Sequence, residues 1–159
     1  MAIDRVREYF RKYGMEERIL EFEESSATVE LAAEAVHTQA RRIAKSLSFM
    51  VGEKPILIIA AGDAKVDNHK YKAQFGKKAK MLTPEQTEER IGHRVGGVCP
   101  FAIKEDVDVY LDESLRRFQT VFPACGSSNS AIELTISELE KYAQNVVSWV
   151  DVCKGWQEF

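Results

Sequence analysis

Two neighbouring stretches near the middle of the chain carry the strongest apolar pattern. Residues 43–51 (IAKSLSFMV) precede the turn residues Gly52-Glu53-Lys54, and residues 55–61 (PILIIAA) follow them. The second stretch is apolar almost throughout, which is typical of a central strand that is covered on both faces. The pattern therefore predicts two strands joined by a tight turn at the core of the protein.

Further strand and helix patterns lie on both sides of this pair. Alternating or β-branched runs predict strands, whereas apolar residues at helical spacing behind a capping residue predict helices. The other expected strands cover residues 19–23, 78–82, 107–112, 120–124, 131–135 and 146–152, and the expected helices cover residues 5–13, 29–36, 68–75, 84–91 and 138–144, with a further helical turn at Thr38. The expected N-caps are Asp4, Thr28, Asp67, Thr83 and Ser137, and the expected helix ends are Gly14 and Gly92. Many short strands with interspersed helices predict an α+β fold with a curved, mixed and barrel-like β-sheet.

Length and composition limit the class of protein. The 159 residues are 45% hydrophobic and 30% charged, which fits a single globular domain over residues 1–159. No apolar run reaches the length of a membrane span, and the N-terminus is charged, so we expect a cytoplasmic protein without a secretory signal. The three cysteines, Cys99, Cys125 and Cys153, show no metal-ligand spacing, so we expect free thiols, no disulfide framework and no structural zinc.

Charge is distributed unevenly along the chain. The net charge of −3 makes a general DNA-coating protein a poor fit, because such proteins need a cationic surface. Between Asp63 and Lys80, however, lysines outnumber acidic residues, and aromatic residues are interleaved among them. This stretch is either a solvated helix face or a docking site for an anionic partner. Its lysines are Lys65, Lys70, Lys72, Lys77, Lys78 and Lys80.

The stretch 92–101 (GHRVGGVCPF) combines backbone freedom, a proline and a thiol. Gly96 and Gly97 can adopt positive φ angles and allow a ligand to approach their amides. Pro100 fixes its own φ and biases Cys99 toward an extended conformation. The stretch is therefore either a structural turn or a loop that presents N–H donors.

Two further features are compatible with a pocket. In the expected strand 43–51, Lys45 has the same parity as the apolar residues, so its ammonium group either reaches solvent or projects into a cavity that receives an anion. The segment 125–130 (CGSSNS) offers small hydroxyl and amide groups around Gly126. Such residues suit the binding of a small polar group, but they also suit an ordinary surface loop.

Four motifs resemble the YbaK/EbsC family in order and spacing. They are IAKSLSF around Lys45, the Gly62, Asp63, Val66 and Asp67 element, GGVCPF at 96–101, and GSSNSAIEL at 126–134. This family is the aminoacyl-tRNA deacylase domain that is also inserted in bacterial prolyl-tRNA synthetases. The resemblance covers essentially the whole chain and is that of a free-standing member.

The resemblance implies that the chain hydrolyses the ester between a wrong amino acid and tRNA, since a second hydrolytic site can separate small amino acids that one binding site cannot. It implies that Lys45 is the key polar residue, and that the amides of Gly96 and Gly97 stabilise the substrate carbonyl. It implies no metal, nucleotide or organic cofactor, and leaves open a synthetase partner and a monomeric or dimeric state. The expected substrate-binding residues are Cys99, Pro100, Gly126, Ser127, Ser128 and Asn129, and the expected tRNA-binding residues are Lys65, Lys70, Lys72, Lys77 and Lys78.

Two departures from the family pattern leave the amino-acid specificity open. Cys99 stands where serine is common, and residues 127–131 replace a more basic stretch that usually ends in aspartate. A cysteinyl, alanyl, seryl or threonyl ester, with proline tRNA as the expected carrier, fits the resemblance. Because an aminoacyl ester is already activated, water or the substrate's own hydroxyl or thiol can attack it. Cys99 is then expected to be a small group that lines the pocket.

Two alternatives from other classes are a thiol hydrolase and a non-catalytic tRNA-binding module. The hydrolase would use Cys99 or Cys125 as nucleophile with a histidine as base, and the candidate histidines are His37, His69 and His93. No base stands at a fixed spacing from Cys99 in the sequence. The binding module would keep the lysine-rich stretch without turnover.

Overall fold

The centre of the computed structural model, which describes residues 2–157, is an antiparallel pair of strands, β2 (Ile43–Val51) and β3 (Lys54–Ala61). Their register runs from Ala44 opposite Ala61 to Val51 opposite Lys54, so the turn consists of residues 52 and 53. Every residue of β3 after Lys54 is buried. The predicted core pair is thus confirmed, and Lys54 belongs to the second strand because it pairs with Val51.

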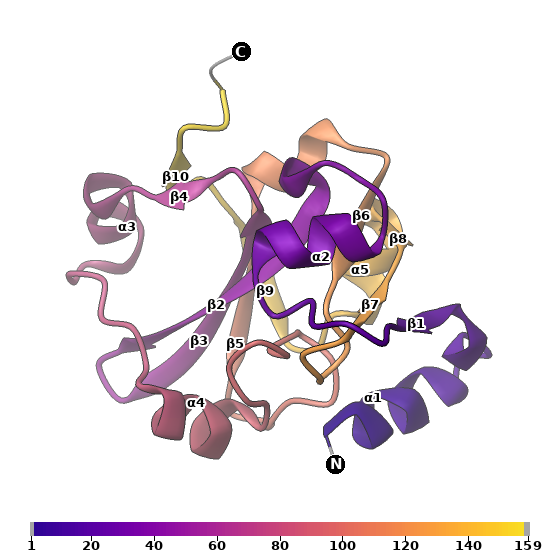
Figure 1. The fold of residues 1–159 in the computed structure, drawn as a ribbon. Coiled ribbons are helices and arrows are strands. Elements are labelled where there is room, and N and C mark those ends of the chain that lie inside the picture. The colour runs from indigo at the N-terminus through magenta and orange to yellow at the C-terminus, as the bar shows by residue number, and fades with distance from the viewer. Residues whose placement is uncertain (1, 158–159) are drawn as a thin grey trace.

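Six strands of the described chain form one mixed sheet in the order β8-β6-β2-β3-β5-β9. β2 runs antiparallel to β3 and parallel to β6, while β3, β5 and β9 are parallel to one another. The outer members are β6 (Thr120–Pro123), β8 (Leu134–Thr135), β5 (Asp108–Asp112) and β9 (Val146–Val150). The sheet curls into a half-barrel (Figure 1), as the α+β prediction expected. Two short antiparallel pairs complete the strands, namely β1 (Ile19–Glu21) with β7 (Ser130–Ile132) and β4 (Lys65–Val66) with β10 (Cys153–Lys154).

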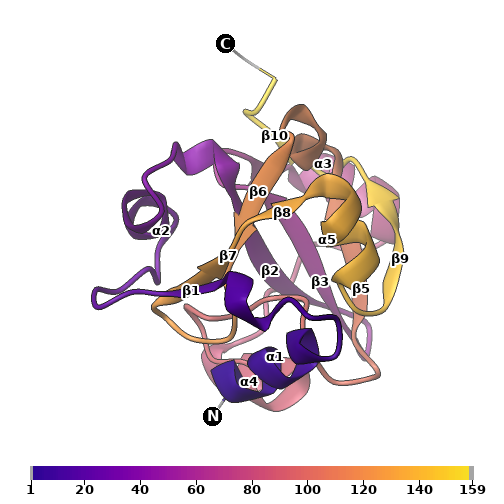
Figure 2. The same ribbon diagram turned by 90° about the vertical axis from the view of Figure 1, so that its right-hand side faces the viewer.

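Helices surround this sheet at several points. Figure 1 shows α2 in front of the strands, α3 beside β4 and β10, and α1 and α4 at the end opposite the C-terminus. Figure 2 shows α5 beside β8. The helices of residues 2–157 are α1 (Ala2–Arg11), α2 (Val29–Ala35), α3 (Asn68–Phe75), α4 (Pro84–Ile91) and α5 (Ile136–Tyr142), with short 3₁₀ turns at Glu16–Arg18, Ala40–Arg42 and Glu113–Arg117.

Local capping signals predicted most of the helix ends. Thr28 caps α2, and Asp67 caps α3 by accepting two backbone N–H groups. Thr83 and Gln86 form a capping box at α4, and this helix ends at Gly92, whose φ is +104°. A left-handed φ at a helix end favours glycine, which has no Cβ to clash.

Two predicted caps were wrong. Asp4 lies inside the first turn of α1, which begins at Ala2. The N-cap of α5 is Thr135, which forms a capping box with Glu138. The signal for this cap is the spacing of threonine and glutamate, and it outweighs the neighbouring Ser137 because it satisfies two backbone N–H groups reciprocally.

Some predicted strands are shorter or divided. Residues 78–82 do not form a strand, because their pairing with β2 is limited to a bridge at Met81 and two backbone hydrogen bonds. The run 131–135 divides at the exposed Glu133, since β7 pairs with β1 and β8 pairs with β6. The last run stops at Val150, and β10 follows as a separate strand.

Candidate active site

A cavity of about 300 Å³ lies beside β2 where the neighbouring strands separate. β6 pairs with Ile43 and Ala44 at the start of β2, whereas residues 80–82 bond to Ser48 and Met50 farther along. Residues 45–47 lie between these two neighbours and line the cavity. The other walls come from parts of the segments 26–32, 81–87, 95–98 and 122–131. The cavity thus lies beside the stretch of β2 that is bonded neither to β6 nor to residues 80–82.

Lys45 is among the residues that line this cavity. That the cavity receives an anion there stays a prediction. Its Nζ donates to the carbonyl oxygen of Gly62 at 3.3 Å and to that of Ala64. An ammonium group has three N–H donors, so one remains for another acceptor. Burial lowers the pKa of Lys45 below its ordinary value, because the charged form loses hydration.

Gly62 explains how the Lys45 ammonium is positioned. A Cβ atom at Gly62 would lie 2.0 Å from the carbonyl oxygen of Ala40 and 2.8 Å from a methyl group of Val29. Any side chain at this position would therefore displace the backbone that carries one acceptor of Lys45. This close packing is a physical reason for glycine in the Gly62-Asp63 motif.

Gly96 and Gly97, two of the three glycines of the loop 92–101, have different roles. Gly96 lines the cavity with a φ of +97°, which favours glycine. Gly97 packs against the next loop, since a Cβ atom there would lie 2.7 Å from the carbonyl carbon of Gly126 and from the amide nitrogen of Ser127. The Gly97 amide donates to the carbonyl oxygen of Arg94 at 3.0 Å. Its N–H is therefore already bonded within the turn.

The predicted binding loop around Gly126 lies behind the cavity wall. Ser127 Oγ is 2.8 Å from both Asn129 Oδ1 and Ser130 Oγ, and Asn129 Nδ2 donates to the carbonyl oxygen of Phe22. The carbonyl of Ser128 accepts from the backbone N–H of Ser26 at 2.6 Å. These bonds tie the loop to the segment 22–26, and the following residues, Ser130 and Ala131, line the cavity.

Cys99 and Pro100 point into the core rather than into the cavity. Cys99 is fully buried, and its Sγ lies 3.5 Å from His93 Nε2 and 3.7 Å from the carbonyl oxygen of Phe101. Pro100 is buried, and its carbonyl oxygen accepts from the backbone N–H of Gln144. The expectation that Cys99 is a pocket-lining group does not fit this placement, because the chain turns the thiol toward His93.

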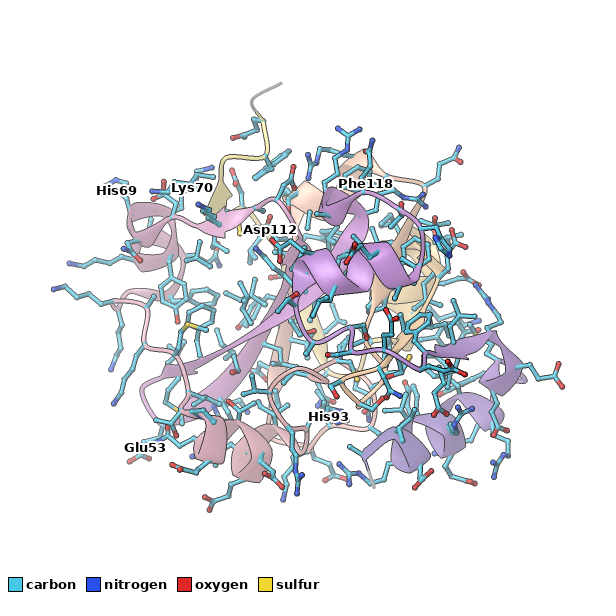
Figure 3. The ribbon with its side chains drawn as sticks, viewed as in Figure 1. Glu53, His69, Lys70, His93, Asp112 and Phe118 are labelled. Carbon is cyan, nitrogen blue, oxygen red and sulfur yellow. The ribbon has the colours of Figure 1, made fainter. Side chains whose placement is uncertain are left out.

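The predicted tRNA-binding lysines occupy one side of the molecule. Lys72, Lys77 and Lys78 are exposed on α3 and the segment after it, and Lys65 is exposed on β4. Lys70 is half-buried, because its Nζ bonds Asp151 Oδ1 at 3.0 Å and the carbonyl oxygen of Cys153 at 3.1 Å. Figure 3 shows His69 and Lys70 together on α3, far from His93.

Several cavity residues were missed by sequence reasoning. Ser46 and Ser48 of β2 and Thr87 of α4 line the cavity with hydroxyl groups. The available signal was the alternation of serine with apolar residues in KSLSF, which places both serines on one face of the strand. Met81 and Val95, which also line the cavity, are 58% and 63% exposed, so part of the surface beside it is apolar.

The described residues offer no obvious metal centre. Within the chain from residue 2 to residue 157, no three histidine, cysteine or acidic side chains are grouped so that they could hold a metal ion. In the same range, no helix is long and apolar enough to cross a membrane.

Comparison with protein families gives one match. The family model of the aminoacyl-tRNA editing domain matches residues 23–142. This match agrees with the resemblance to the YbaK/EbsC family and covers all four motifs completely. The N-terminal segment with α1 and β1 and the C-terminal segment with β9 and β10 lie outside it.

Similar proteins extend the match along the chain. The protein YwhH of Bacillus subtilis (strain 168), whose function is uncharacterized, is 56% identical over 158 residues, which cover 99% of this chain and all of YwhH. The "Putative Cys-tRNA(Pro)/Cys-tRNA(Cys) deacylase EbsC" of Enterococcus faecalis is 30% identical over 70% of this chain and 69% of its own length. A proline–tRNA ligase of Limosilactobacillus fermentum is 33% identical over 56% of this chain, but these residues cover only 17% of the ligase.

A solved structure shows the same fold. The crystal structure of a "putative trans-editing enzyme for prolyl tRNA synthetase" superimposes with a TM-score of 0.86 and 27% sequence identity. The alignment covers 97% of this chain and 98% of that chain. The half-barrel sheet and its helices are therefore shared over nearly the whole length.

Proposed function

Because this chain belongs to the aminoacyl-tRNA editing domain family, we propose that it deacylates tRNA that carries a wrong, small amino acid. The candidate esters are cysteinyl, alanyl, seryl and threonyl, and the names of two relatives favour proline tRNA as the carrier. The protein would act in trans, after a synthetase has released its error, and therefore in the cytoplasm, where tRNA is charged. Small amino acids require such a second site because binding energy alone separates them poorly.

The observation that carries this proposal is the small cavity with Lys45 in its lining. Its volume of about 300 Å³ lies at the lower end of ligand sites, which span about 300–1,000 Å³. Ala27, Ala32, Ala44 and Ala131 contribute to its lining. A small aminoacyl group fits such a space, whereas a large aromatic amino acid would need the walls to move.

We infer that Lys45 and Gly96 act on different parts of the substrate. Two N–H groups of Lys45 are bonded to carbonyl oxygens, so the third can donate to a phosphate or ester oxygen of the terminal adenosine. Gly96 lines the cavity without a side chain, so its backbone can approach the ester carbonyl. The Gly97 amide supports this loop, because its N–H bonds Arg94.

The chemistry requires no enzyme nucleophile. An aminoacyl ester is activated by its tRNA leaving group, and a cavity that orients it can let water or a substrate hydroxyl or thiol attack. The bond between the acyl carbon and the ribose oxygen breaks, and the ribose oxygen takes the proton of the attacking group and leaves as a hydroxyl of the freed tRNA. The amino acid leaves as a carboxylate after attack by water, as a cyclic ester after attack by its own hydroxyl, or as a cyclic thioester after attack by its own thiol.

The test is a deacylation assay on proline tRNA charged with each candidate amino acid. Lys45→Ala should lower kcat/KM by at least about 100-fold, the scale on which one transition-state donor acts. Lys45→Gln keeps N–H donors for the Gly62 and Ala64 carbonyls, so it separates loss of catalysis from loss of folding. Lys141→Ala, an exposed lysine on α5, is the matched control and should retain the rate of the unmodified protein.

Two outcomes would contradict the proposal. Undiminished hydrolysis in Lys45→Ala would remove this lysine from the mechanism. If the unmodified chain bound tRNA but hydrolysed none of the esters, the cavity would belong to a non-catalytic tRNA-binding module.

A further inference from the structure

A directed chain of hydroxyl groups runs along one wall of the cavity. Ser48 Oγ lies 3.2 Å from Thr87 Oγ1, and Thr87 Oγ1 donates to the carbonyl oxygen of Thr83 at 2.9 Å. A hydroxyl has a single proton, so Thr87 must accept the bond from Ser48. Ser48 has thus used its proton, and its oxygen can still accept a hydrogen bond.

Ser46 lies two residues earlier on the same strand and shares this face of β2. It lines the cavity, and its hydroxyl is buried without a hydrogen-bond partner among residues 2–157. A buried hydroxyl without a partner costs free energy, and most such groups in folded proteins are bonded. The hydroxyl has less than 1 Å² of accessible surface, so the side chain must turn toward the cavity for a ligand to bond to it, and that bond would recover this cost.

We propose that Ser46, with Ser48 beside it, makes the cavity selective for aminoacyl esters whose side chain carries a hydroxyl, namely seryl and threonyl esters. The proposal rests on the deacylase function proposed above and names the substrate class of the same site. The substrate hydroxyl donates to one serine oxygen and accepts from the Ser46 proton. An alanyl ester fills nearly the same volume but leaves Ser46 without a partner.

A hydrogen-bonding wall discriminates between substrates more strongly than an apolar wall does. Adding or removing a methyl-sized group in an apolar pocket changes selectivity modestly, whereas a site built to bond a hydroxyl strongly rejects the analogue that lacks it. The rejection arises because buried polar groups are left unpaired in the wrong complex. A cysteinyl ester is intermediate, since a thiol is a weaker donor than a hydroxyl.

The experiment compares four esters on one tRNA. The substrates are proline tRNA charged with serine, threonine, cysteine or alanine. The proteins are the unmodified chain and the variants Ser46→Ala, Ser46→Thr and Ser148→Ala, and kcat/KM for hydrolysis is measured for every combination of protein and ester. Ser148 is exposed on β9 and is the matched control. Thermal unfolding of each variant checks that the fold is kept.

We expect the unmodified protein to prefer seryl and threonyl esters to the alanyl ester by about tenfold or more, the effect of one hydrogen bond. Ser46→Ala should remove this preference by slowing hydroxyl-bearing esters about tenfold while leaving the alanyl rate within about twofold. Ser46→Thr keeps the hydroxyl and should retain the preference.

Other results would overturn the inference in distinguishable ways. An alanyl ester that is hydrolysed as fast as the seryl ester contradicts the selectivity while leaving the deacylase function intact. An equal loss on all four esters in Ser46→Ala would assign Ser46 to a group common to every substrate, such as the α-ammonium. If the unmodified protein hydrolyses none of the esters, the proposed function fails and the inference fails with it.

Discussion

His93 and Cys99 meet in the core, where His93 Nε2 lies 3.5 Å from the Cys99 sulfur and 2.7 Å from the carbonyl oxygen of Phe101. A carbonyl oxygen only accepts hydrogen bonds, so Nε2 carries the proton in this contact. The nitrogen that faces the thiol therefore cannot take its proton. Burial also raises the pKa of Cys99 to about 12, which keeps the thiol protonated. The pair has the cysteine and the histidine of a thiol hydrolase, but the cysteine is not in the reactive thiolate form.

The first prediction concerns this thiol. Cys99→Ala and Cys99→Ser should both keep deacylation within about threefold of the unmodified rate, because Cys99 is fully buried and turned away from the cavity. The alanine variant should lose about 1 kcal/mol of unfolding free energy, which is the usual cost of a small core change. Steady-state deacylation and chemical denaturation measure the two effects.

The outcome that contradicts this prediction is equally specific. A loss of several orders of magnitude in both variants, with an acyl group trapped on Cys99, would support a thiol hydrolase. Cys125→Ala is the parallel control, since Cys125 is also fully buried and burial raises its pKa well above the ordinary value.

A second prediction follows from the same histidine. Burial lowers the pKa of His93 below 6.5, and its Nδ1 is buried without a hydrogen-bond partner in the described chain. Between the lowered folded pKa and the unfolded value of about 6.5, the unfolded state binds more protons. The stabilisation that comes from the lowered pKa of His93 is therefore complete above about pH 6.5, and it is lost as the pH falls toward the pKa of His93 in the folded protein.

Denaturant titrations from pH 7.5 to pH 5 measure this effect. The unmodified protein should lose unfolding free energy on acidification, and His93→Gln, which cannot titrate, should show a shallower slope. His69→Gln is the matched control, because His69 is exposed on α3 (Figure 3). Parallel slopes for the unmodified protein and His93→Gln would show that His93 does not titrate in this range.

Elements with strong local signals were predictable from the sequence. β2 begins and ends at the predicted residues, and α3 follows its predicted cap, Asp67, to Phe75. Both rely on information within one segment: apolar residues at regular spacing, a side-chain cap and a glycine end. The prediction of a strand at residues 78–82 was wrong, because the pairing of these residues depends on how far β2 is already bonded to β6. A local sequence pattern carries no information on that bonding.

The site was predictable only in part. The four motifs located Lys45 and Gly96 at the cavity, but residue types alone could not tell which loop residues face inward. Ser127 and Asn129 bond within their loop and to Phe22, and the backbone turn directs Cys99 to His93 across six residues. Ser46 was overlooked because a serine inside a strand usually indicates a solvent-facing position.

A third prediction tests the lysine-rich side of the molecule. The triple variant Lys72→Glu, Lys77→Glu and Lys78→Glu should bind tRNA more weakly. The slope of the logarithm of its binding constant against the logarithm of the salt concentration should become shallower by about 0.7–0.9 for each phosphate contact that is lost. These lysines are exposed, and their segment continues to Met81 at the cavity rim. Filter binding over a range of salt concentrations measures both quantities.

Two controls sharpen this experiment. Lys141→Glu makes a matched change on α5, which lies on the other side of the sheet from α3 (Figure 1), and should leave binding unchanged. Lys70→Gln should affect stability more than binding, since its ammonium is held by Asp151 and by the Cys153 carbonyl. Unaltered binding by the triple variant at every salt concentration would return these lysines to an ordinary solvated surface.

The last prediction concerns the contact between the two loops at the cavity. Gly97→Ala places a Cβ atom 2.7 Å from the backbone of Gly126 and Ser127, which are rigid atoms rather than a flexible side-chain end. One loop must therefore move, at a cost of about 1–3 kcal/mol in unfolding free energy. Gly96 precedes it and lines the cavity, so the displacement should also lower kcat/KM by at least about tenfold.

Gly14→Ala separates the effect of this contact from the general cost of replacing glycine. Gly14 has a φ of +69° and nothing within 4 Å of an added Cβ, so its substitution carries only the left-handed strain of about 1–2 kcal/mol. Deacylation by Gly14→Ala should match the unmodified rate at temperatures where both proteins are folded. If Gly97→Ala also keeps full activity, the two loops can separate without disturbing the site, and Gly97 has no part in positioning Gly96.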